Sequence, residues 1–583
     1  MCGIVAYVGH QNCESILLSA LSHLEYRGYD SAGMAFILKN QQLVRLRAKG
    51  NLFNLSDKLL KFQMMSSSPI HAQIGIAHTR WATHGEANEM NAHPHVDNEG
   101  RIAVVQNGIV HNYLAIKSRL SPKVKFESHT DTEVIAHLIA FYQNEKGLDI
   151  TNAIRNTIND LEGDLALAIL SVNAPNEIFV YSRNTPLIIG KCSDGYWCAS
   201  DLVALNACEK YMRLPNDTLA KISAAKISAE KLARETQITE AKWEAEWEAK
   251  WHRMPVLNIQ KQGYDSYMLK EVFEQPKIIA NIARWDEAKV KGWKKGIKSV
   301  QLIAAGSSWH AALIGQYVLE KKARLTTRVW VASEYVKANP PLSACSLTLA
   351  ISQSGETADV LNAVKWERKR RKEQNCLYQC PIIAITNRKE STLAQYVNEI
   401  WPMNVGVEMA VAATKSFVAT LMMLYKLAGI KTEELLPLAS EVEHVLRTES
   451  TRMREMAEQV IKFPLCIFMG RGLLWPIAME ASLKLTEVAN LASLAYAAGE
   501  MKHGYLALLS QETLVICLSC ADHQVEEIEA RGASVMRLDL EGEQIHVAIK
   551  TLVCLQMLSY YAAKLKGLDV DRPRHLAKSV TVF

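Results

Sequence analysis

After Met1 the chain begins Cys2-Gly3-Ile4-Val5-Ala6-Tyr7-Val8-Gly9. The apolar run bounded by glycines predicts a strand that is buried on both faces and holds Cys2 at its start. Once Met1 is removed, the α-amine of Cys2 titrates near ~8 and lies within reach of its own thiol, so one residue supplies nucleophile and base. A lone cysteine is nevertheless more often a small hydrophobic residue of the core, so Cys2 needs partners before it indicates catalysis.

The composition limits the class of protein. A length of 583 residues predicts about three or four domains. Apolar residues make up 49% and charged residues 22%, as in soluble globular proteins. The net charge of +5 gives no electrostatic footprint for nucleic acid. We interpret the basic run at 368–372 as a solvated helix end.

The twelve cysteines are scattered and no secretory signal precedes them, which favours a reducing cytoplasm. Cys517 and Cys520 lie in or beside an apolar run, so a buried strand is favoured over a metal or redox site. No apolar stretch reaches the ~18 uncharged residues of a membrane span. The longest candidate, residues 410–430, is interrupted by Lys415 and Lys426, so we expect no membrane partner.

Three regions separate along the chain. Residues 1–231 alternate short strands, turns and helical patterns, which predicts a layered α+β domain. Residues 232–262 are polar, and their tryptophans at every fourth position (Trp243, Trp247, Trp251) predict a short amphipathic helix in a linker. From residue 263, strands followed by helices predict parallel α/β sheets, and a second copy of this pattern begins at Cys466.

The loop from Ser352 to Thr357 follows a predicted strand and precedes a predicted helix. Its hydroxyls and the helix N-terminus suit a phosphate monoester, although serines that merely cap the helix explain it about equally well. A matching loop at Ser307-Ser308, on an adjacent strand, favours a phosphorylated small molecule.

Four residues of the first region are candidate partners for Cys2. Arg80 offers a fork for a carboxylate, Asn107-Gly108 offers donors to an oxyanion, and Asp131 offers a carboxylate to an ammonium group. Singly, a surface salt bridge, a turn and a helix cap are each more probable. Together these groups match a free α-amino acid with a side-chain amide.

Longer motifs carry a resemblance to a known family. They are MCGIVAYVG at 1–9, LEYRGYDSAG at 24–33, HTRWATHG at 78–85, NAHPH at 91–95, QNGIVHN at 106–112, SHTDTEVIAHL at 128–138, MLKEVFEQP at 268–276, SQSGETADVL at 352–361, EASLKLTEVA at 480–489, YAAGEMKHG at 496–504 and PRHLAKSVTV at 573–582. The chain resembles the isomerising glutamine–fructose-6-phosphate transaminases over nearly its whole length. The resemblance implies an α+β four-layer Ntn-hydrolase-type glutaminase domain (1–231), a linker (232–262), two α/β SIS domains with parallel sheets flanked by helices (263–440 and 441–570) and a tail (571–583) that contributes to the sugar site.

The resemblance also implies roles for single residues. In the glutaminase half Cys2 would attack the glutamine amide, Asn107 and Gly108 would stabilise the oxyanion, and Arg80 and Asp131 would bind the α-carboxylate and α-ammonium groups. Trp81, Thr83 and His84 would form a closing wall, and Arg27 and Trp81 match positions near an internal ammonia channel.

In the sugar half Lys578 would form a Schiff base with the ketone of fructose 6-phosphate. Glu487 would move a proton between C1 and C2, Lys484 would support that transfer, and His503, supplied by the neighbouring subunit, would open the ring. The resemblance implies a homodimer, no cofactor and no metal. The residues implied to bind the sugar phosphate are Ser307, Ser308, Ser352, Gln353, Ser354 and Thr357.

Several positions depart from the family pattern, and we expect four of them to cluster around the sugar site. Gln106 stands where histidine is common in the family. The four others are Ala305, Thr486, Tyr505 and His575, of which His575 stands where asparagine is frequent. Two alternatives therefore accompany synthesis of glucosamine 6-phosphate: a paralogue that aminates another keto-sugar phosphate, and a non-catalytic sugar-phosphate sensor.

Overall fold

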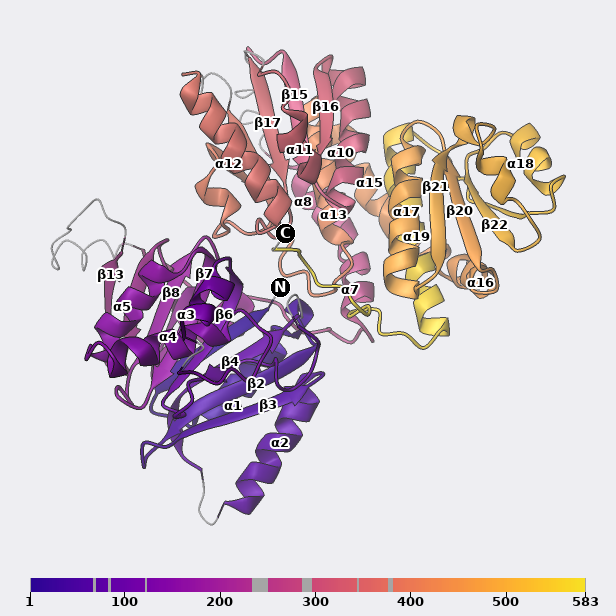
Figure 1. Cartoon of the computed structure of the whole chain (residues 1–583). Helices are drawn as coiled ribbons and strands as arrows, with labels where there is room; N and C mark the ends of the chain where they lie inside the picture. The colour runs from indigo at the N-terminus through magenta and orange to yellow at the C-terminus, as the bar shows by residue number, and fades with distance from the viewer. Residues whose placement is uncertain are drawn as a thin grey trace. The chain divides into compact units, whose positions relative to one another are not determined.

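The computed structural model describes residues 2–66, 70–81, 85–120, 123–232, 250–285, 296–342, 345–375 and 381–581. The chain divides into two compact units, one of residues 1–259 with 580–582 and one of residues 260–579 with 583 (Figure 1). Thr83, His84, Trp243 and Trp247, with the helix predicted around the tryptophans, lie outside the described residues. Each unit is treated separately below.

The first unit contains two antiparallel sheets. The eight-stranded sheet has the order β14 (His252–Arg253), β11 (Lys210–Arg213), β9 (Ile188–Cys192), β10 (Gly195–Ala199), β1 (Gly3–Gly9), β4 (Ala72–Arg80), β2 (Ser31–Leu38), β3 (Leu43–Lys49). The six-stranded sheet has the order β13 (Ile227–Lys231), β12 (Thr218–Ile222), β8 (Ile178–Arg183), β7 (Gly163–Ser171), β6 (Ile102–Val110), β5 (His95–Val96). β14 pairs with β11, so the end of the predicted linker forms an edge strand of this unit.

Alternating side chains make four layers of these sheets. On β6, Ala103 and Val105 enter the core between the sheets, whereas Ile102 and Val104 pack against helices. Those helices are α3 (Tyr113–Leu120), α4 (Glu133–Asn144) and α5 (Ile150–Asp160), and α1 (Cys13–Ser22) and α2 (Leu52–Met65) contact the eight-stranded sheet. All seven residues of β1 are buried, which confirms the strand predicted behind Cys2 and the layered α+β domain.

The second unit contains two parallel sheets. The first has the order β16 (Thr326–Val331), β15 (Ser299–Ala304), β17 (Ser346–Ile351), β18 (Ile382–Thr386), β19 (Glu399–Pro402). The second has the order β21 (Ala492–Ala497), β20 (Leu465–Gly470), β22 (Thr513–Leu518), β23 (Ser534–Arg537). Every paired strand runs parallel to its neighbour, as the sequence predicted.

Helices cover both faces of each parallel sheet. Their bounds are α7 (Tyr267–Phe273), α8 (Gln275–Ala283), α10 (Ser307–Val318), α11 (Ala332–Ala338), α12 (Ala358–Glu373), α13 (Lys415–Ala428), α14 (Thr432–Leu435), α15 (Pro437–Thr448), α16 (Ser450–Val460), α17 (Leu474–Ala489), α18 (Asp522–Glu529) and α19 (Gln544–Leu565). In the first sheet Leu302 faces the core shared with α10 and α13, and Ile303 faces α11 and α12. Cys517 lies inside β22, so its buried-strand interpretation is confirmed.

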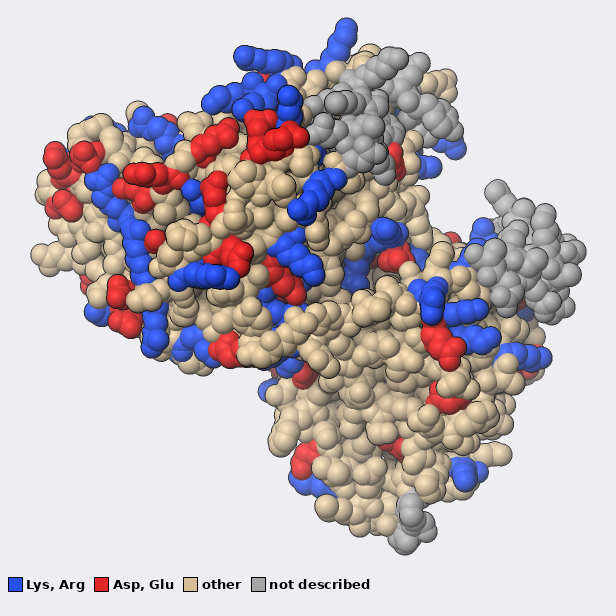
Figure 2. All heavy atoms as spheres, turned by 180° about the vertical axis from the view of Figure 1, so that it is seen from behind, with Lys and Arg blue, Asp and Glu red and all other residues tan. Residues whose placement is uncertain are grey.

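Two sequence interpretations need correction. Arg370 and Arg371 of the basic run are buried, because both pair with the buried Glu367 and Arg371 also donates to Thr348. The most membrane-like helix is α19 rather than residues 410–430, and 83% of its most apolar window is buried within the protein. On the face seen in Figure 2, acidic and basic side chains are interspersed.

Candidate functional sites

The thiol of Cys2 lies at the start of β1, half-buried beside the end of β4. The backbone N–H of Trp81 points to its Sγ at 3.4 Å, and Asn107 Nδ2 donates to the Cys2 carbonyl at 3.1 Å. The Cys2 Sγ also donates to the backbone carbonyl of Trp81 at 3.7 Å, so both polar groups of the Trp81 backbone lie against the sulfur. Strands β1, β4 and β6 therefore bring together three residues that are distant in sequence.

Gly108 accounts for the shape of the strand beside Asn107. Its φ is +108°, and a Cβ added there would lie 1.8 Å from the carbonyl oxygen of Asp164 on β7. Only glycine fits both this conformation and the close approach of β7. The residue pair is a strand position rather than the turn that the dipeptide alone suggests.

Arg80 and Asp131 complete a charged group near Cys2. Burial lowers the pKa of the Arg80 guanidinium, and the neighbouring Cys2, Asp131 and Asp30 oppose that effect. Asp131 Oδ2 accepts from the backbone N–H of Val110 at 2.7 Å, so this carboxylate lies at β6 beside the Asn107 segment. Arg27 is buried and ion-paired with Asp201 at 3.0 Å.

In the second unit the two serine loops follow the adjacent strands β15 and β17. Ser352 Oγ lies 2.9 Å from Thr357 Oγ1 and accepts from the N–H of Gly355 at 3.1 Å. Thr357 precedes α12 without a side-chain cap bond. The hydroxyls therefore bond within the loop rather than cap the helix. Gly355 has φ +64°, and a Cβ there would meet Ser391 at 2.1 Å.

A buried ionic network joins α10 to α17. His310 Nδ1 lies 2.8 Å from Glu480, Lys484 lies 3.3 Å from Glu480 and also pairs with Glu487, and Ser307 bonds to Glu480. Burial alone would lower the pKa of Lys484, but the two carboxylates raise it above its ordinary value. Lys484 is therefore held as an ammonium ion between them.

Lys578 lies in the tail and is itself ion-paired. Its Nζ donates to Glu408 at 2.6 Å and to the Ala410 carbonyl at 2.7 Å. Glu408 also accepts from the Ser416 hydroxyl and backbone N–H. Burial would raise the pKa of Glu408, but Lys578 and these donors lower it to about 2. Glu408 is thus a fixed anion that pairs with the amine of Lys578.

A second carboxylate, Glu271, holds the backbone on which Lys578 rests. Its Oε1 accepts from the N–H groups of Met409 and Ala410 at 2.5 and 3.3 Å. Burial and then the charge of Glu408 raise the pKa of Glu271 to about 8. The tail also reaches the serine loop, because Ser354 Oγ donates to Ser579 Oγ at 3.2 Å.

Sequence reasoning missed Glu271, Glu408, His310 and Glu480. Glu480, Lys484 and Glu487 share one helix face at i, i+4 and i+7, a signal that could have identified Glu480. Glu408 has no such signal, since only the fold brings it to a lysine 170 positions away.

The remaining predicted residues differ in their surroundings. His503 is exposed on the segment after β21, and Tyr505 stacks on Tyr496. Thr486 is exposed and lies 3.1 Å from Ser493, beside β21. His575 is exposed with φ +63°. Among the described residues, the side chains of Ser308 and Gln353 form no hydrogen bond with another residue.

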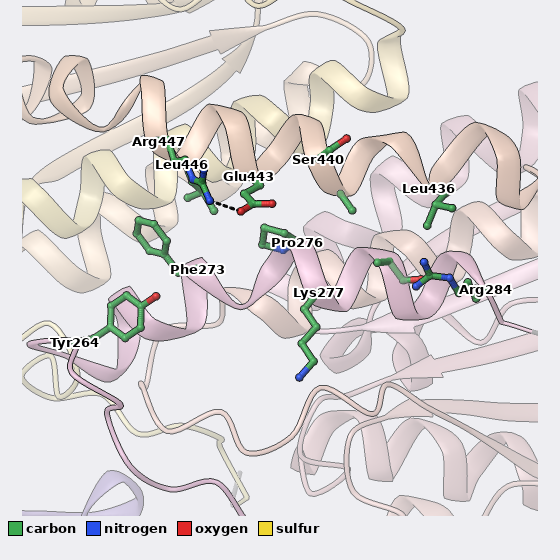
Figure 3. A pocket seen from close by; sticks show the side chains of 12 residues that line it. Tyr264, Phe273, Pro276, Lys277, Arg284, Leu436, Ser440, Glu443, Leu446 and Arg447 are labelled. Atoms are coloured by element: carbon green, nitrogen blue, oxygen red, sulfur yellow. Dashed lines mark hydrogen bonds and ion pairs between the residues drawn. The ribbon is translucent and has the colours of Figure 1, made fainter.

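A separate hollow of about 640 Å³ lies along α8 and α15 (Figure 3). Lys277, Arg284 and the Glu443–Arg447 ion pair are among its lining residues. None of the predicted site residues lines it. It is a distinct surface feature of the second unit.

Residues 78–207 match the glutamine amidotransferase domain family, and residues 295–429 and 466–532 match the SIS domain family. The chain is 37% identical to the glutamine–fructose-6-phosphate aminotransferase (isomerizing) of Cyanidium caldarium and 37% identical to that of a Synechocystis species, with 100% of both chains covered in each case. The solved C-terminal domain of glucosamine-fructose-6-phosphate aminotransferase from Francisella tularensis is 30% identical, covering 54% of this chain and 100% of that domain with a TM-score of 0.49.

Proposed function

Because the chain belongs to the family of isomerizing glutamine–fructose-6-phosphate aminotransferases, we propose that it converts glutamine and fructose 6-phosphate into glutamate and glucosamine 6-phosphate, the entry step of amino-sugar synthesis. The observation that carries the proposal is the presence of two chemically complementary sites in one chain. Cys2 with its donors suits amide cleavage, and Lys578 beside a hydroxyl-rich loop suits a ketose phosphate.

In the glutamine reaction the Cys2 thiol adds to the side-chain amide carbon, and its α-amine, freed by removal of Met1, accepts the proton. The C–N bond then breaks, the proton passes to the leaving nitrogen, and ammonia departs from a glutamyl thioester that water hydrolyses. Asn107 and Gly108 donate to the oxyanion. Arg80 and Asp131 bind the α-carboxylate and α-ammonium groups of glutamine.

Trp81 closes one side of this site against water, and Thr83 and His84, which the family resemblance assigns to the same wall, lie outside the described residues. Exclusion matters because ammonia that is protonated or lost to bulk water cannot act as a nucleophile. Arg27, which is buried and ion-paired with Asp201, belongs with Trp81 to the path by which ammonia leaves the glutamine site.

In the sugar reaction Lys578 forms a Schiff base at C2 of the open-chain ketose, which requires release of its proton and of its bond to Glu408. Glu487 moves a proton between C1 and C2, and Lys484 holds that carboxylate in place. The phosphate binds to the residues of the two serine loops and the helix N-termini beside them. These residues are Ser307, Ser308, Ser352, Gln353, Ser354 and Thr357.

His503 opens the sugar ring from the neighbouring subunit of a homodimer. Its exposure on a surface segment supports this assignment, since an exposed residue is available to a second copy. The ten cysteines that the structure describes are free thiols, which supports a reducing, cytoplasmic location.

One assay tests the proposal. The full-length protein is incubated with glutamine and fructose 6-phosphate, and glutamate and glucosamine 6-phosphate are measured together. Equal yields are expected. Glutamate without amino sugar would indicate another acceptor sugar, and turnover of neither substrate would leave only sugar-phosphate binding.

A further inference from the structure

Three buried histidines stand behind the Cys2 site without a role in the reaction described above. The ring of His78 on β4 stacks on that of His93 with 4.2 Å between centroids, and His95 on β5 meets His93 edge-on at 4.9 Å. At most 5% of any of the three residues is exposed. Buried polar rings are retained where their hydrogen bonds fix something, so their partners identify what is fixed.

The partners of His78 determine its tautomer. Its Nε2 lies 3.0 Å from the backbone oxygen of Gln106 and 3.1 Å from Oδ1 of Asn107. A backbone carbonyl can only accept, so Nε2 of His78 carries the hydrogen. The Asn107 amide must then present its oxygen to this N–H, because its NH₂ group would face another donor.

That constraint reaches the reacting residue. With Oδ1 of Asn107 bound to His78, Nδ2 points the other way and donates to the backbone carbonyl of Cys2 at 3.1 Å. We propose that His78 is a positioning residue for amide cleavage, because its Nε2–H locks the Asn107 side chain with the nitrogen directed at the site where the oxyanion forms. This inference rests on the proposed glutamine reaction.

The other two histidines hold the segments on either side. His93 Nδ1 accepts from the backbone N–H of Gln106 at 3.3 Å, so it fixes the residue before Asn107. His95 Nε2 lies 2.9 Å from the hydroxyl of Thr130, next to the ammonium-binding Asp131. The histidine stack therefore connects the segment that carries Asn107 to the segment that carries Asp131.

All three rings are uncharged at neutral pH. Burial lowers the pKa of His78 and of His95 to about 3 and that of His93 well below its ordinary value. A neutral His78 has one N–H, and two carbonyl oxygens share it. The hydrogen bond from His78 Nε2 to Asn107 Oδ1 is consequently unchanged at every pH at which the enzyme is expected to work.

The test compares H78F with wild type in the full-length protein. Phenylalanine keeps the stacked ring and removes the donor, so kcat for glutamine hydrolysis should fall about 10- to 100-fold with KM changed less than about threefold. Alkylation of Cys2 by iodoacetamide displaces iodide and forms no oxyanion, so its rate should stay within about twofold if only the oxyanion donor is disturbed. H78Q, which restores an N–H donor, should recover part of kcat.

A double-mutant cycle separates positioning from packing. In the N107A background H78F should have no further effect on kcat, because the amide that it orients is absent. H546F, the same exchange at a buried histidine of the other unit, is the control and should leave hydrolysis unchanged. Additive losses, equal losses in alkylation and hydrolysis, or an unchanged kcat would each overturn the inference.

Failure of the proposed function gives a different result. Wild-type protein without glutamine hydrolysis contradicts that function, whereas active wild type with an equally active H78F contradicts only the role of His78. The tautomer can be read without turnover by nitrogen NMR of labelled histidine. A hydrogen on Nδ1 of His78 rather than Nε2 would overturn the proposal directly.

Discussion

The two candidate sites differ in the groups that hold their reacting atoms. The groups that contact Cys2 itself are neutral, namely the Trp81 backbone and the Asn107 amide with the histidine stack behind it, and the charged Arg80 and Asp131 lie beyond them. Around Lys578 and Glu487 the supports are buried ions, including Glu408 and Glu480. Neutral groups such as those around Cys2 keep their hydrogen bonds when the pH changes. The ion pairs around Lys578 and Glu487 are stable only while each charge keeps its partner.

The two sites also differ in the structural elements that must come together to form them. The first is built from strands of one pair of sheets, so folding alone positions it. The second needs helices of two α/β layers and a tail whose amine is ion-paired in this state. In the proposed reaction the substrate competes with Glu408 for Lys578, so we expect sugar binding to be the step that frees this amine.

The largest expected effect is on glutamine hydrolysis at the Cys2 site. C2A removes the nucleophile, and glutamate release should fall at least about 10³-fold while sugar-phosphate binding is retained. Glutaminase assays and fructose 6-phosphate titration measure the two quantities. C192A is the control, because Cys192 lies on β9 by the opposite end of β1. Unchanged hydrolysis in C2A would refute the assigned nucleophile.

K578R removes the proposed Schiff-base amine from the sugar site, as C2A removes the nucleophile from the glutamine site. Arginine keeps a positive charge beside Glu408 but cannot form a Schiff base, so amino-sugar synthesis should fall at least about 10³-fold, with the decrease in glutamate release limited to about threefold. Borohydride trapping of the wild-type adduct, followed by mass analysis, locates the lysine. K564R, an exposed exchange on α19, should behave as wild type. Trapping at another lysine would contradict the assignment.

E480Q tests whether the ionic framework depends on a single partner. Loss of this carboxylate leaves the buried Lys484 with only Glu487, so the free energy of unfolding of the second unit should fall by about 3–5 kcal/mol. Urea unfolding of the full-length protein measures it. The exposed exchange E458Q should cost less than about 0.5 kcal/mol. A loss no larger than that control would show that Lys484 does not need Glu480.

The pH response should differ between the sites because Glu271 titrates in the second. Its folded pKa is raised to about 8, so its stabilising contribution is complete below its ordinary pKa of about 4.3 and is lost as the pH rises through 8. In E271Q this loss is absent. Between pH 5 and 8 the free energy of unfolding of the wild type should therefore fall relative to that of E271Q, by up to about 1.4 kcal/mol per pH unit.

Urea unfolding at several pH values checks this slope. E443Q, an exchange on the exposed Glu443–Arg447 pair, supplies the control and should run parallel to wild type. Parallel curves for E271Q as well would mean that Glu271 is already ionised at pH 5. The pH dependence of the glutamine hydrolysis rate should show no corresponding inflection from His78, His93 or His95, because these buried histidines stay uncharged.

The same contrast explains what sequence could predict. β1 and the two serine loops could be read from local patterns, since strands and glycine turns leave continuous signals. The ion partners could not, because Glu408 meets Lys578 only after the tail folds back and Glu480 meets His310 only when α10 and α17 pack. Arg370 and Arg371 were misplaced for the same reason: a run of charges gives no sign of the buried Glu367 that neutralises it.

The smallest expected effect is at His575, where the family commonly has asparagine. Its φ of +63° lies in the left-handed region, which asparagine adopts with less strain than most residues, so the backbone explains the family preference without any contact to sugar. H575N should therefore raise stability by a few tenths of a kcal/mol at most, about the size of a surface effect, and leave amino-sugar synthesis within about twofold. A loss beyond that range, measured as kcat with fructose 6-phosphate, would place the His575 side chain in the sugar site after all.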